Sequence, residues 1–92
     1  MNIGLLTLDI FLPDSHSLKE KRMVLRSLKD RLRKFNISIS ECDHQDLWQR
    51  ATLGIVSISS DHGVLERTLT AVVDESEKIL NGSLSHYHIE YL

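Results

Sequence analysis

The chain has a single cysteine, Cys42, so it can form no internal disulfide, and a reducing compartment is the expected setting. One cysteine alone also provides no zinc site. The apolar run at residues 3–12 contains Asp9, is too short to span a membrane and lacks the basic segment that begins a signal peptide. We therefore expect a cytoplasmic protein with no membrane partner. A chain of 92 residues buries a modest core, to which self-association can add stability.

Glycine is also sparse, and the four that occur are scattered singly, at Gly4, Gly54, Gly63 and Gly82. The chain thus has no Gly-rich loop to cradle a phosphate and no serine in a nucleophile elbow. The segment 12–17, after the first predicted strand, contains neither arginine nor glycine and does not match the phosphate cradle of acylphosphatases. We predict a protein that is not an enzyme and needs no cofactor or metal.

Hydrophobic periodicity predicts one domain, residues 1–92, with six elements. Strands are expected at about 2–12, 37–43, 50–59 and 84–92, and helices at about 18–35 and 63–80. The order strand, helix, strand, strand, helix, strand, with short connections, predicts an α+β fold. This is the ferredoxin-like βαββαβ sandwich, in which two helices cover one face of a four-stranded antiparallel sheet.

Two local patterns refine this prediction. Ser17 and Glu20 form a capping box at the start of the first helix, and Glu20 is expected to reach back to the backbone N–H of Ser17. In the third strand the alternation slips between Ile55 and Val56, which indicates a bulge or a strand buried on both faces.

The net charge of -2 hides a strong asymmetry. Residues 19–34 contain eight basic and two acidic side chains, whereas the rest of the chain contains three basic and eleven acidic ones. At about 100° per residue, five cations share an arc of about 80° on the side of the first helix away from its apolar stripe. These residues, here called the basic stripe, are Lys19, Arg22, Arg26, Lys29 and Arg33. The stripe predicts a surface for phosphates, most simply of RNA, or else a solvated face balanced by carboxylates from elsewhere in the fold.

Lys21 is an exception on this helix because it points into the apolar stripe. The favoured interpretation is a snorkelling side chain whose amine reaches solvent. The alternative is a buried pair with Glu41, Asp43 or Asp46.

The polar segment 41–50 contains the only tryptophan, Trp48. One interpretation has Trp48 closing the end of the core beside a single helical turn capped by Asp43 and Asp46. The other is a recognition loop, in which Trp48 stacks on a base or a partner's ring while Gln49 and Arg50 donate hydrogen bonds. Spacing in this segment is not specific enough to predict a metal site.

The uncovered face of the sheet is expected to present apolar residues, chiefly Ile3, Leu5 and Phe11, with Cys42 and Val56 as further candidates. Such a patch predicts a protein interface, in the first place a homodimer and in the second a different protein. RNA-recognition motifs share the topology but stack bases on aromatic residues of the central strands. The third strand has no aromatic residue between 51 and 59, so we expect any RNA contact from the helix and loops.

Two segments, Ser17–Leu28 and Glu41–Gly54, resemble the YlxP-like family of uncharacterised bacterial proteins, the domain of unknown function 503. The resemblance implies a ferredoxin-like fold and genes beside those for translation initiation and ribosome maturation. It implies no catalytic residues, and Cys42 departs from the aliphatic residue usual there. We therefore expect a non-enzymatic accessory factor that binds RNA or a ribosomal particle, and no DNA. The alternatives are a protein-interaction module whose basic helix meets an acidic partner, and an enzyme or small-ligand sensor using residues 41–50.

Overall fold

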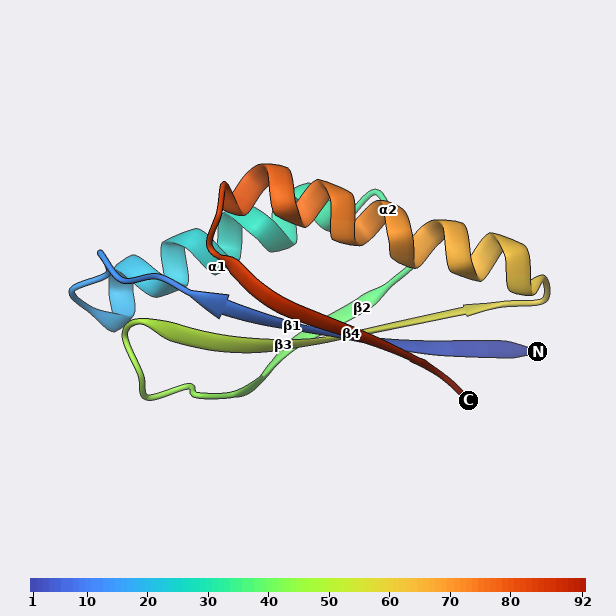
Figure 1. Ribbon diagram of the computed structural model, residues 1–92, viewed down its shortest axis with the longest axis horizontal. Coiled ribbons are helices and arrows are strands. Elements are labelled where there is room, and N and C mark those ends of the chain that lie inside the picture. The colour runs from blue at the N-terminus through green and yellow to red at the C-terminus, as the bar shows by residue number, and fades with distance from the viewer.

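The computed structural model describes residues 1–92 and contains all six predicted elements. They are β1 (Asn2–Phe11), α1 (Leu18–Leu32), β2 (Ser38–Asp43), β3 (Arg50–Ser59), α2 (His62–Leu80) and β4 (Leu84–Tyr91). The strands form one antiparallel sheet in the order β2-β3-β1-β4, and both helices lie on the same face of it (Figure 1). This arrangement confirms the ferredoxin-like βαββαβ fold. Neither helix is long and apolar enough to cross a membrane.

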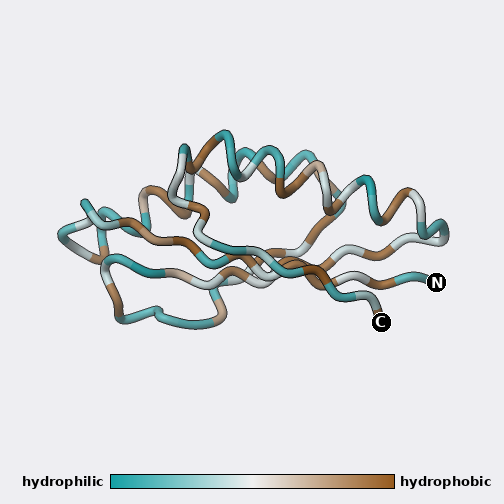
Figure 2. Tube along the Cα trace, in the orientation of Figure 1, coloured by the Kyte–Doolittle hydropathy of each residue, from teal (hydrophilic) through white to brown (hydrophobic).

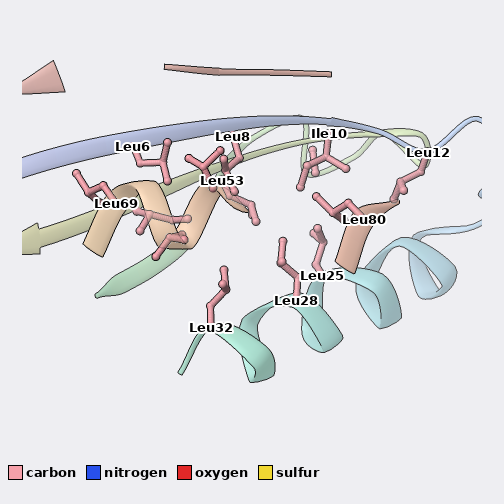
Figure 3. Packing of buried hydrophobic residues seen from close by; sticks show 14 of the residues in the cluster. Leu6, Leu8, Ile10, Leu12, Leu25, Leu28, Leu32, Leu53, Leu69 and Leu80 are labelled. Carbon is pink, nitrogen blue, oxygen red and sulfur yellow. The ribbon is translucent and has the colours of Figure 1, made fainter. Parts of the chain in front are cut away.

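The core lies between the two helices and the central strands β1 and β3. Alternate residues of β1 point toward the helices, and Figure 2 shows the alternation of hydrophobic and hydrophilic residues along the strands. Leu6 and Leu8 are fully buried, and Leu28 of α1 points toward the sheet from across the layer (Figure 3). Each such leucine contributes about 1.5–3 kcal/mol by leaving water. Because both helices pack on this one face, the other face of the sheet is left uncovered.

The helix starts follow local capping signals with one difference at α1, and α1 ends at Leu32, short of the expected end near residue 35. The Ser17 hydroxyl accepts a hydrogen bond from Glu20 N at 3.1 Å, as a capping box requires. The Glu20 carboxylate, however, accepts from the backbone N–H of His16 and not from that of Ser17. The Asp61 side chain caps α2 by accepting from Val64 N at 3.1 Å.

The prediction that β3 contains a bulge or is buried on both faces was wrong. Its register with β1 is continuous from one end to the other, and the shifts lie instead at the edges, in β2 after Glu41 and opposite β4 after Asp9. Ile55 points into the core, whereas Val56 is 43% exposed on the uncovered face. Ile55 and Val56 are therefore both apolar because the core and the uncovered face are both apolar at this point. The pleat of the strand is regular.

Candidate nucleic-acid interface

The basic stripe of α1 is largely free of ion pairs. Only Arg33 has a carboxylate within 4.0 Å, that of Asp30 at 3.0 Å. Lys34, which lies outside the stripe, is the cation that meets α2, through Glu75 at 3.7 Å. Lys29 is partly buried and the other four members of the stripe are exposed. Balancing of the stripe by carboxylates from other elements, the alternative left by the sequence, is therefore not found.

The stripe borders the exposed edge of the sheet. Arg22, Arg26, Lys29 and Arg33 line a shallow hollow of about 230 Å³, and Glu41 of the edge strand β2 lines its other side. The Glu41 carboxylate is already paired, at 2.9 Å, with the ammonium of Lys21. The one acid of the sheet that lines this hollow is thus held by a buried lysine, while Asp30 of α1, which also lines it, pairs with Arg33. The cations of the stripe have no carboxylate partner from the sheet.

Lys21 is the most unusual side chain of the molecule because it is 1% exposed. Its Nζ donates hydrogen bonds to the carbonyl oxygens of His44 at 2.8 Å, Arg50 at 3.1 Å and Gln45 at 3.3 Å, in addition to the Glu41 pair. Snorkelling, the favoured interpretation, was wrong, and the alternative of a pair with Glu41 is confirmed. Burial of the charge is tolerated because every N–H of the ammonium has an oxygen to bind. Lys21 thereby ties α1 to both ends of the 44–49 loop.

That loop does not place Trp48 in the core. The loop contains no helical turn, and it turns through a left-handed His44 (φ 63°) with Leu47 N donating to His44 O at 3.0 Å. Trp48 is 53% exposed, so the expectation that it closes the end of the core was wrong. Figure 1 shows the loop between β2 and β3 extending from the sheet on the side opposite the helices, at the end where α1 begins.

A second hollow, of about 440 Å³, opens beside this loop, and we call it the aromatic hollow. It is lined by Phe11, Asp46, Leu47, Trp48, Gln49 and Arg50. The structure therefore brings together the three residues expected in a recognition loop and adds Phe11, which the sequence had suggested as an interface residue. The Gln49 amide donates to Pro13 O at 3.1 Å, while the Arg50 guanidinium has no carboxylate within 4.0 Å.

The uncovered sheet face is apolar only at one end. Ile3 lies opposite Ile58 and Leu5 opposite Val56, which makes one patch of four apolar side chains, here called the apolar patch. Ile58 was missed by the sequence, although its even spacing from Val56 placed it on that face. Phe11 lies at the other end of β1, opposite Arg50, and does not belong to the patch.

The middle of this face separates the apolar patch from the aromatic hollow. Asp9 accepts a hydrogen bond from the Thr52 hydroxyl at 2.9 Å on adjacent strands. Cys42 is exposed on the same face, close enough to Gly54 that a Cβ there would lie 2.8 Å from its sulfur. The two halves of the face thus differ in chemistry.

Fold and surface together define a small ferredoxin-like α+β protein in which most cations of the basic stripe have no carboxylate partner. The chain belongs to the family described as protein of unknown function (DUF503), whose model matches residues 3–89. It is 43% identical over 72 residues to the uncharacterized protein YlxP of Bacillus subtilis (strain 168), covering 77% of this chain and 78% of that protein. This confirms the resemblance noted from the helix and loop motifs.

Solved structures of low identity share the fold. The de novo designed protein Foldit4 superposes with a TM-score of 0.56 at 9% identity, over 99% of this chain and 94% of the design. SnoaB, a cofactor-independent oxygenase from Streptomyces nogalater, superposes with a TM-score of 0.54 at 12% identity, over 99% of this chain and 90% of SnoaB. A C-terminal segment of the alpha subunit of aIF2 from Pyrococcus abyssi superposes with a TM-score of 0.51 at 14% identity, over 100% of this chain and 49% of that segment. At these identities the likeness concerns the fold alone.

Proposed function

We propose that this protein binds RNA through the basic stripe of α1 as a non-enzymatic accessory factor, and that ribosomal particles are its target. The observation that carries the proposal is that four of the five stripe cations lie on one flank of α1 with no carboxylate within 4.0 Å. Such an array lowers the stability of the helix, because like charges at spacings of three and four repel by a few tenths of a kcal/mol per pair. A phosphate backbone would remove this repulsion.

The overall charge of -2 does not oppose such binding. At physiological ionic strength, exposed charges more than about 8 Å apart are largely screened, so a polyanion responds to the nearest side chains. Residues 19 to 33 span about 21 Å along the helix axis, enough to contact several phosphates. Four or five contacts to a single strand predict a slope of about -3 in a plot of log affinity against log salt concentration.

The test is co-sedimentation with bacterial ribosomal particles, and binding to a short RNA, at about 50 mM salt. The double variant Arg22→Glu/Arg26→Glu is expected to lose binding by at least about tenfold. The matched control is Arg31→Glu/Arg67→Glu, which makes the same charge change at two exposed residues outside the stripe. Unchanged binding of the first variant, or an equal loss in both, would overturn the proposal.

A second candidate function, self-association, is favoured by the apolar patch. We propose that a second copy covers this patch, because sheet faces that pack together interdigitate their side chains at small crossing angles. A two-fold axis parallel to β1 would place Leu5 and Val56 of each copy against the same residues of the other. Val56→Glu is expected to abolish concentration-dependent dimerisation in sedimentation velocity, whereas Thr70→Glu on the exposed surface of α2 is not. A monomer at all concentrations would end this candidate.

A further inference from the structure

The aromatic hollow carries an inference that rests on the proposed function and extends it. Two aromatic rings from distant segments, Phe11 at 47% exposure and Trp48 at 53%, flank this hollow. Neither ring stacks on another aromatic ring or on a cation of the protein; those contacts occur elsewhere, between His62 and Tyr91 and between Lys34 and Phe35. Keeping two large rings half in water forgoes hydrophobic stabilisation, which an external planar group stacked on them would recover.

The loop that presents Trp48 is held before any ligand arrives. The ammonium of Lys21 binds carbonyl oxygens at both ends of the loop. On the side facing β1, Leu12 N donates to Gln49 O at 2.8 Å, and the Gln49 amide donates to Pro13 O at 3.1 Å. A loop fixed by its backbone in this way loses little conformational entropy when a ligand binds.

The lining of the hollow specifies the ligand further. The exposed Arg50 guanidinium adds a positive charge beside the rings, and the Asp46 carboxylate adds an acceptor that repels phosphate. A nucleotide fits this combination: its base stacks on an aromatic face, its amino groups can donate to Asp46, and its phosphate lies toward Arg50. A purely apolar peptide would leave both charged groups without partners.

We infer that the aromatic hollow binds an unpaired base of single-stranded RNA, stacked on Trp48 and Phe11. Bases within a duplex are stacked on one another and are not available to such a surface. The loop between β2 and β3, which lines most of the hollow, lies at the end of the molecule where α1 begins (Figure 1). An RNA held by Lys19 and Arg22 near the start of α1 can therefore continue toward the hollow. The stripe then supplies affinity for phosphates, and the hollow supplies preference for a single strand.

Trp48 is the only tryptophan, so its fluorescence reports on this hollow alone. We would titrate the full chain with a twelve-nucleotide oligoadenylate, with an RNA duplex of the same length and with inorganic polyphosphate. All three are expected to bind with salt-dependent affinity, and the single strand alone is expected to quench Trp48. Trp48→Ala should weaken single-strand binding by about 5- to 150-fold, the range measured for loss of one stacked base, and leave polyphosphate binding unchanged.

Matched variants separate stacking from folding. Trp48→Phe is expected to keep most of the single-strand affinity because it retains an aromatic face. Tyr87→Ala, which removes an exposed aromatic ring from β4, is expected to change none of the affinities. Circular dichroism of Trp48→Ala should match the parent, since the ring lies outside the core.

The outcomes distinguish the inference from the proposed function. If none of the three polyanions binds, the proposed function fails and the inference fails with it. If all three bind but Trp48→Ala binds the single strand normally, or the duplex quenches equally, only the inference is overturned. If the fluorescence shifts on raising the protein concentration without RNA, a second copy covers the hollow, and the inference is likewise overturned.

Discussion

The ammonium of Lys21 lies 2.9 Å from the carboxylate of Glu41, and both groups are enclosed between α1 and the edge of the sheet. The same ammonium holds three backbone carbonyls of residues 44–50. One side chain of the first helix thus determines the position of a loop more than twenty residues later in the chain. The Lys21 side chain therefore contributes both to the stability of the fold and to the shape of the aromatic hollow.

Lys21→Met should destabilise the fold by about 3–5 kcal/mol, because it leaves the Glu41 carboxylate and three carbonyls without their donor. Urea unfolding followed by circular dichroism measures the change. The double variant Lys21→Met/Glu41→Leu should recover part of the loss, since no unpaired charge remains buried. Equal destabilisation of the single and double variants would show that the carboxylate is not the source of the cost.

Arg26→Ala should leave the protein as stable as the parent or raise its stability by up to about 0.5 kcal/mol, because it removes repulsion from Arg22 and Lys29. The same substitution should weaken RNA binding. Adding salt should raise the thermal midpoint of the parent more than that of the variant, as screening acts on the repulsion. Scanning calorimetry at two ionic strengths tests this, and a clear loss of stability in Arg26→Ala would show that the stripe has a structural role.

Two glycines on adjacent strands should respond differently to alanine. A Cβ at Gly4 would lie 2.6 Å from Leu69 Cδ1, which is fully buried in the core, so Gly4→Ala should cost about 1–3 kcal/mol through overpacking. A Cβ at Gly54 would meet the Cys42 sulfur at 2.8 Å, but that thiol is exposed and can rotate away. The free energy of unfolding of Gly54→Ala should therefore lie within about 0.5 kcal/mol of that of the parent. Equal costs in chemical denaturation would contradict this account.

Tyr91 is 41% exposed, and the part of its ring that is removed from water raises the pKa of the phenol above its ordinary value of 10.0. The negative charge of Glu66 raises this pKa further. A raised phenol pKa means that the folded state favours the neutral form. This contribution to stability is complete below the unfolded pKa and is lost as pH rises through the folded one. Glu66→Gln should lower the pKa only in part, since burial is the larger cause. Ultraviolet titration of the chain minus that of Tyr91→Phe isolates this phenol; an unchanged pKa in Glu66→Gln would exclude the electrostatic contribution.

The existence and order of the elements were predictable because most have a clear hydrophobic periodicity, although the alternation slips in β3 and α1 ends at Leu32, short of the expected end near residue 35. The observed helix starts, after Ser17 and Asp61, follow from side chains that cap them locally. The role of Lys21 was not predictable in full, since three of its four partners are backbone carbonyls whose position depends on the path of a distant loop. Phe11 lies at the aromatic hollow because the pairing of β1 with β3 places it opposite Arg50. That register depends on two strands together, so the sequence of one strand does not predict it.

The uneven distribution of charge also affects how the molecule turns as it comes close to a charged partner. Eight of the eleven basic side chains lie within sixteen consecutive residues, while eleven of the thirteen acidic ones lie elsewhere. Within about 8 Å of a polyanion, where screening is incomplete, such a protein experiences a torque that turns α1 toward the polyanion, although its net charge of -2 is weakly repelled. Wrongly oriented encounters are repelled by its own carboxylates.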